Sequence, residues 1–193
     1  MSPLFGKKKR FVVTNLFVAV DASAFVPLLT MCARAEQRIV ASDGNFEVAT
    51  EQVAKIAGGL IDQREHWTHA ALFGDVVDDE GQADAVAQEA FADLSTRYLS
   101  AGDEDARPDA AVEVNPGERR AVAMLTVAFE GEEAVLEHDV ENVVLLEESL
   151  QRIVALHHQG RLLVAHIHHA PAHPEDKLTD EQLLVNYPEL MTL

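Results

Sequence analysis

The sequence predicts an α+β fold in which two strand–helix–strand units in tandem form one antiparallel sheet. An apolar run at residues 10–21 recurs at residues 119–130, and each copy is followed by a segment with helical periodicity and then by a second apolar run. Spacings of three and four between apolar residues are typical of helices, whereas alternation is typical of strands. Tandem units of this kind usually build the ferredoxin-like plan. We therefore expect a ferredoxin-like four-stranded antiparallel sheet with additional helices.

Each half of the chain has one helix between its two strands. We expect this helix at residues 47–62 in the first half and at residues 143–158 in the second, because apolar side chains recur on one face of each segment. The closing strands are expected at residues 67–77 and 161–169. Further helices are expected at residues 25–40, 82–99 and 178–184.

Both faces of the predicted sheet are apolar. In the two leading strands, Leu16 and Leu125 lie on one face, and Phe17 and Met124 lie on the other. A face exposed to water would carry polar residues instead. The second face must therefore be covered by the additional helices at 25–40 and 82–99 or by a second copy of the chain, and we expect a homodimer.

The length of 193 residues is typical of one domain. We expect a single domain, 1–193, built of two pseudo-repeats at about 9–99 and 119–193. The segment 100–118 is acidic and contains two prolines and two glycines, a composition typical of an exposed linker. This segment is therefore expected to join the two pseudo-repeats.

The charge balance excludes some classes of partner. Thirty-three acidic against fifteen basic side chains give a formal charge of −18, which repels nucleic-acid phosphates and anionic lipids. We therefore expect a protein partner or self-association, and no nucleic acid. Cys32 is the single cysteine, so no intramolecular disulfide can form, and a reducing cytoplasmic location is expected.

The N-terminal region is similar to a secretion signal, because the basic run Lys7–Arg10 precedes an apolar stretch. The stretch contains Asn15, however, and its counterpart at residues 119–130 lies where no signal can act. We therefore predict a strand. No apolar run reaches the roughly 18 residues of a membrane span, so no integral span is expected.

Histidines cluster near the end of the chain, where six of the nine lie between His157 and His173. On a strand, His166 and His168 share one face, and His173 can return from the following turn as a third ligand. Zinc or another divalent metal requires three or four such ligands. The alternative is that an exposed strand simply carries polar histidines there, and the sequence leaves both interpretations open.

No complete catalytic motif is present: the sequence contains no nucleophile elbow, no P-loop and no dinucleotide fingerprint. The first hypothesis is therefore a non-enzymatic protein-interaction or assembly module. The alternative is a metal-binding protein or metal-dependent enzyme that uses the histidine-rich segment. A third hypothesis is a small-molecule sensor that binds its ligand in a sheet–helix or dimer groove.

The C-terminal sequence "LLVAHIHHAPAHPEDKLTDEQLLVNYPELMTL" resembles the end of an uncharacterised family of cyanobacteria, plastids and other bacteria, the domain of unknown function numbered 1517. The matching features are the strand Leu162–Ile167, the turn at Ala170–Pro171, the acidic helix Leu178–Leu184 and the terminal Tyr187–Pro188. The earlier stretches "REHWTHA" and "AVAQEAFADLSTRYL" are also similar to the family pattern.

The histidines depart from that pattern, because aromatic or acidic residues are usual where His166 and His169 stand. The resemblance implies no activity, cofactor or site residue, since none is established for the family.

Overall fold

The computed structural model describes residues 9–101, 119–140, 142–173, 175–176 and 178–193, with the side chains of 98–101 left aside. The predicted linker 100–118 lies almost entirely outside the described residues, as do Lys7 and Lys8 of the basic run. In the part of the chain that is described, no helix is both long enough and apolar enough to cross a membrane.

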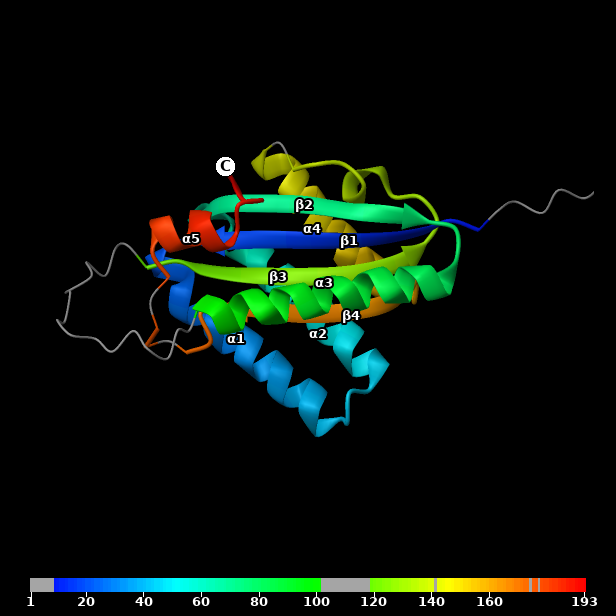
Figure 1. Cartoon of the computed structure of the whole chain (residues 1–193), viewed down its shortest axis with the longest axis horizontal. Coiled ribbons are helices and arrows are strands. Elements are labelled where there is room, and N and C mark those ends of the chain that lie inside the picture. The colour runs from blue at the N-terminus through cyan, green and yellow to red at the C-terminus, as the bar shows by residue number, and fades with distance from the viewer. Residues whose placement is uncertain (1–8, 102–118, 141, 174, 177) are drawn as a thin grey trace, which may run out of the picture.

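Five antiparallel strands form one sheet (Figure 1). In chain order they are β1 (Phe11–Val20), β2 (Trp67–Val77), β3 (Ala121–Glu130), β4 (Leu162–Ala170) and β5 (Met191–Thr192). Their order across the sheet is β4-β3-β1-β2-β5. The two similar segments, 10–21 and 119–130, are thus neighbouring central strands, as the recurrence of this apolar run in the two halves predicts. Leu16 pairs with Leu125, its counterpart in the other half, so the strand order is symmetric about this pair.

The predicted ferredoxin-like plan is wrong, and only the α+β class is confirmed. A ferredoxin-like unit is split, so another strand lies between the two strands that its helix connects. Here β1 pairs directly with β2, and β3 pairs directly with β4. The reason is that the connection between the two strands of each half begins and ends at the same end of the sheet, so the strands run antiparallel and pair directly. In the first half, Asp21 N donates to His66 O at 2.9 Å. In the second half, Arg161 Nη2 donates to Glu130 O at 2.9 Å.

Three helices cover one face of the sheet: α1 (Ala22–Ala41), α2 (Phe46–Asp62) and α4 (Val143–His158). Asp21 begins α1 by accepting from Ser23 N at 2.8 Å. Asp43 and Gly44 adopt the left-handed conformation between α1 and α2, and this turn allows α2 to run back beside α1. The short helices η1 (Arg64–His66) and η3 (Ala134–Leu136) lie in the connections.

Two helices, α3 (Glu80–Ala101) and α5 (Asp180–Asn186), cover the other face (Figure 1). Phe17 is 0% exposed and Met124 is 2% exposed beneath them. Of the two helices predicted as candidates for this role, 82–99 covers the second face, whereas 25–40 packs on the first. Because the chain's own helices bury this face, the argument for a homodimer through it does not hold.

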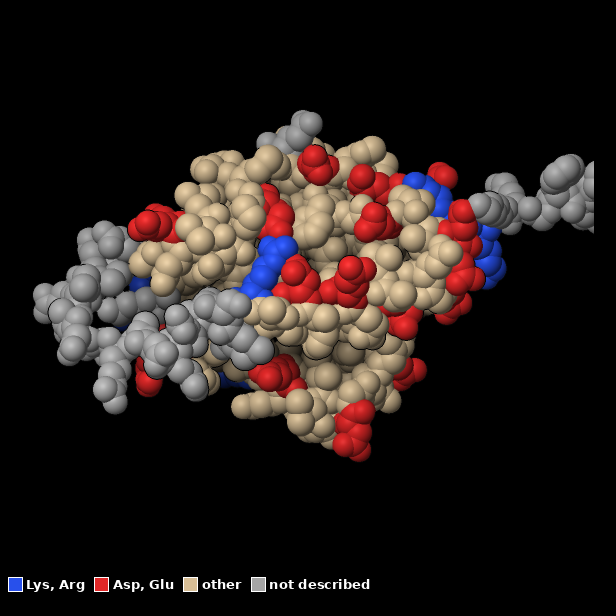
Figure 2. Space-filling model, viewed as in Figure 1, with Lys and Arg blue, Asp and Glu red and all other residues tan. Residues whose placement is uncertain are grey.

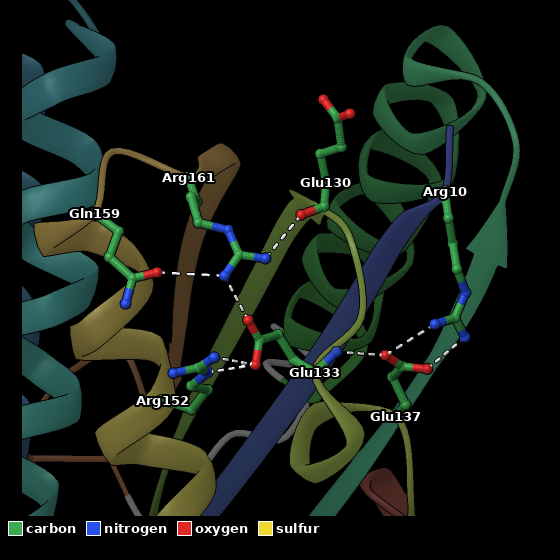
Figure 3. A network of polar contacts seen from close by, with 7 residues as sticks. All are labelled: Arg10, Glu130, Glu133, Glu137, Arg152, Gln159 and Arg161. Atoms are coloured by element: carbon green, nitrogen blue, oxygen red, sulfur yellow. Dashed lines mark hydrogen bonds and ion pairs between the residues drawn. The ribbon is translucent and has the colours of Figure 1, made fainter. Parts of the chain in front are cut away.

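A network of ion pairs joins the two halves at one end of the sheet (Figure 3). The carboxylate of Glu133 is 7% exposed and accepts from Arg152 Nε and Arg161 Nη1, both at 2.5 Å. Its backbone N–H donates to Glu137 Oε1 at 2.7 Å, and Glu137 in turn accepts from Arg10 Nη2 at 2.5 Å. The loop after β3 is thereby tied to α4, to β4 and to the start of β1.

We expect Glu133→Gln to lower the free energy of unfolding by about 2–3 kcal/mol, because a buried carboxylate that pairs with two guanidinium groups becomes neutral. The matched control is Glu132→Gln, since the side chain of Glu132 is 80% exposed and its ion pair with Arg10 spans 3.3 Å. The control should change stability by less than about 0.5 kcal/mol. Urea unfolding of both variants measures the difference. Equal losses of unfolding free energy in the two variants would show that the buried network contributes no more to stability than an exposed ion pair does.

Candidate functional site

The outer edge of β4 is open, because β4 is the last strand of the sheet and no described strand pairs with its outer side. At the opposite edge, β5 pairs with part of β2 at His69 and Ala70. Exposed edge strands are commonly protected by lysine, other charges, proline or bulges. The nine residues Leu162–Ala170 contain no acidic residue, lysine, arginine or proline, and only a register shift near Leu162 disturbs the pairing with β3.

A groove of about 670 Å³ runs along this edge. One wall is formed by Cys32, Glu36, Ile39 and Val40 of α1, and the other by Phe91 of α3. The floor consists of residues 165–169 of β4, and Ala172 and His173 of the following turn close one end. We call this hollow the β4 groove. A strand whose residues 166–169 are partly exposed therefore lies at the bottom of a channel between two helices.

The walls of the β4 groove are mainly apolar. Val40, which is 69% exposed, and Phe91, which is 39% exposed, both line the groove. Glu36 is the one carboxylate among the groove's described lining residues. By contrast, acidic side chains outnumber basic ones on the described face that Figure 2 shows. The groove is therefore a charge-poor patch on an acidic protein, and such patches commonly mark interaction sites.

His166 and His168 lie side by side on the face of β4 that meets α3, as the alternation of strand side chains predicts. The ring of Phe91 packs against both, with centroid distances of 4.8 Å to His166 and 4.5 Å to His168. Burial lowers the pKa of His166 despite the nearby carboxylate of Asp84. Burial, together with His166 and His169, lowers the pKa of His168 to about 4. Both rings are therefore neutral at physiological pH.

The third predicted metal ligand does not join this pair. His173 is exposed on the turn after β4, and among the described residues no group of three histidine, cysteine, aspartate or glutamate side chains is arranged to hold a metal ion. His169 is engaged elsewhere, with Nδ1 at 3.0 Å from Pro171 O. Metal binding by His166, His168 and His173 thus stays a prediction.

Sequence reasoning missed the groove itself. The periodicity of residues 82–99 places Phe91 on the inward stripe, but its ring lies at the margin of the sheet and forms a wall. Cys32 is buried as the helical stripe predicts, and burial raises the pKa of its thiol to about 12, so the groove has no reactive thiolate. The available signal was the uncharged run Leu162–Ala170, which does not by itself show that the strand lies at an edge.

We expect acid to destabilise the protein partly through His168. Between about pH 4 and pH 6.5, the unfolded chain binds a proton at this imidazole that the folded chain does not bind, so stability falls as the pH drops through this range. His168→Gln should reduce the loss between pH 7 and pH 4.5 by about 2 kcal/mol, measured by urea unfolding. His173→Gln, at an exposed position, is the control and should keep the wild-type slope. Parallel curves for wild type and His168→Gln would exclude this contribution.

Comparison with known proteins identifies a family but no activity. Residues 10–193 match the family described as Protein of unknown function (DUF1517). Neither a search of curated proteins nor a search of solved structures found a match. The match extends from the start of β1 through the β4 groove to β5 and agrees with the resemblance in the C-terminal sequence. The chain therefore belongs to the DUF1517 family of proteins of unknown function.

Proposed function

We propose that this protein is a non-enzymatic interaction module that binds an extended segment of a partner protein along the outer edge of β4. The observation that carries this proposal is the open nine-residue edge of β4, of which residues 165–169 form the floor of a mainly apolar groove. Outer-edge N–H and C=O groups of a terminal strand can pair with an added strand, and neighbouring pockets then select its alternate side chains.

The groove has contacts for both faces of such an added strand. Val40 and Ile39 of α1 lie on one side and Phe91 of α3 lies on the other, so alternate side chains of the bound segment would meet apolar surface on each side. Nine residues of strand extend over about 30 Å, which accommodates a comparable length of partner. The backbone hydrogen bonds would provide affinity, and the apolar walls would set the register by selecting alternate side chains.

The charge of the protein favours a neutral or basic segment. The formal charge of −18 attracts cationic partners and repels anionic ones. Glu36 lies in the groove wall, and Asp84 of α3 lies close enough to His166 to influence its pKa. The preferred partner is therefore an extended segment with alternating apolar residues and without an excess of acidic ones.

A partner segment fits the edge better than a second copy of the chain does. The hairpin of α1 and α2 extends beyond β4 on one side of the sheet (Figure 1). This hairpin would obstruct the approach of a whole second domain to the edge more than it would obstruct an extended segment. Two copies that each carry a formal charge of −18 also repel one another. We therefore assign the edge to a partner, in a reducing cytoplasmic setting that the lone buried Cys32 supports.

The test uses a displayed library of random 12-residue peptides, because the natural partner is not identified. Peptides enriched on the full-length protein are synthesised, and hydrogen exchange is followed with and without them. We expect slower exchange at the alternate amides of residues 163–169 that point away from β3. Enriched peptides that protect a different part of the molecule, or the absence of any enrichment, would contradict the proposal.

A pair of exposed valines provides the matched variants. Val40→Lys places a charge at the groove wall and should weaken peptide binding at least tenfold, because it removes an apolar contact and repels a basic segment. Val185→Lys, at a 73% exposed position on α5, should leave the affinity unchanged. Equal affinity of the two variants contradicts the proposed groove. A micromolar dimer whose β4 amides are protected without peptide would assign the edge to a second copy instead.

A further inference from the structure

A second groove lies between α1 and α2, on the side of α1 that faces away from β4. It has a volume of about 610 Å³, within the range of small-ligand sites. The floor contains Ile56 of α2, which is 0% exposed, and Ala35 of α1, which is 2% exposed. We call this hollow the α1–α2 groove. It shares no lining residue with the β4 groove.

The two helices that form this groove approach closely beside it. A Cβ atom at Gly59 of α2 would lie 2.3 Å from the sulfur of Met31, so any larger residue there would push this side chain aside. The side chain of Met31 thus lies against the backbone of α2 and also lines the groove. The groove is therefore supported by packed helices and not by a flexible loop.

Positive charge is concentrated at one end of the α1–α2 groove. Arg34 and Arg38 lie one turn apart on α1, and Lys55 faces them from α2. Lys55 pairs with Glu51 at 2.5 Å, whereas neither arginine has an ion pair or side-chain hydrogen bond to the described residues. Like charges one turn apart repel. The carboxylate of Glu51 lies near this cluster, because its hydrogen bond with Lys55 and the charge of Arg38 both lower its pKa. No acidic residue is among the described lining residues of the groove, so in a chain with 33 acidic and 15 basic residues the lining carries an excess of positive charge.

The other end of the groove is apolar. Val26, which is 54% exposed, and Pro27 line it, and Met31 lies between them and the arginines. Residues 26–38 of α1 extend over about 18 Å at 1.5 Å per residue. The lining thus passes from apolar to cationic along a single direction.

We propose that the α1–α2 groove binds a single anionic amphiphile. Its carboxylate or phosphate head is held by Arg34 and Arg38, and its aliphatic chain lies over Met31 toward Val26. Guanidinium groups bind both kinds of head through charge-assisted hydrogen bonds. An acidic amphipathic helix would require cations distributed along the whole groove, whereas here they lie at one end, so the arrangement favours a ligand with a separate head and tail.

Titration calorimetry with three probes, used below their critical micelle concentrations, distinguishes the contribution of the head to binding from that of the tail. Decyl phosphate has both parts, decyl maltoside has the tail with an uncharged head, and inorganic phosphate has no tail. We expect micromolar binding of decyl phosphate and at least tenfold weaker binding of the other two. Decanoate in place of decyl phosphate shows which head is preferred. Equal binding of decyl maltoside, or no binding of either anionic amphiphile, overturns the proposal.

The variant Arg34→Gln/Arg38→Gln should weaken binding of the preferred anionic amphiphile at least tenfold. Both side chains are exposed, so the variant should fold, and its melting temperature verifies this. The control Lys9→Gln/Arg64→Gln removes the same charge outside the groove and should bind as wild type does. Unchanged affinity in the first variant overturns the proposal, as does binding of an acidic helical peptide where decyl phosphate fails to bind. Neither result bears on the β4 groove, which Val40→Lys tests separately.

Discussion

The antiparallel pairing of β1 with β3 is the constraint on which the rest of the structure depends. Every residue of β1 is buried, and so is every residue of β3 except Glu130, because both strands lie in the middle of the sheet with apolar side chains on both faces. The polar side chains inside this pair are hydrogen-bonded: Thr126 Oγ1 donates to Asn15 Oδ1 at 2.6 Å, and Thr14 Oγ1 donates to Leu136 O at 2.7 Å. Two apolar faces require two layers of helices, and the five α-helices of the described residues form these layers.

This arrangement leaves backbone open only at the sheet edges, and the two edges differ. The β2 edge is partly paired by β5 and carries Asp75 beyond that pairing, whereas the β4 edge has neither a partner strand among the described residues nor a charge of its own. Helix α1 forms a wall of the β4 groove with Cys32 and Val40, and a wall of the α1–α2 groove with Arg34 and Arg38. The two sides of one helix therefore present chemically different surfaces, one almost uncharged and one cationic.

Burial beside Phe91 determines the charge of His166 and His168. Phe91 packs on the rings of His166 and His168, and the resulting burial favours their neutral forms. Two neutral imidazoles add no charge to the groove, in which Glu36 is the one carboxylate among the described lining residues. No third ligand is grouped with them in the part of the chain that the structure describes.

The sequence by itself determined the class of fold, most of the elements and the burial of both sheet faces. Helix 143–158 has the predicted bounds, because hydrophobic periodicity is a local property that the chain fixes within a few turns. The repeated segment predicted that β1 and β3 are neighbours, but the places of β2 and β4 were decided only by the tertiary structure. Alternation is the same whichever strand is the neighbour, and the connections of β1 to β2 and of β3 to β4 each begin and end at the same end of the sheet. The grooves were likewise beyond the sequence. Phe91 and Val40 are 51 positions apart in the chain, and only the packing of α3 and α1 on opposite faces of β4 places them along one edge.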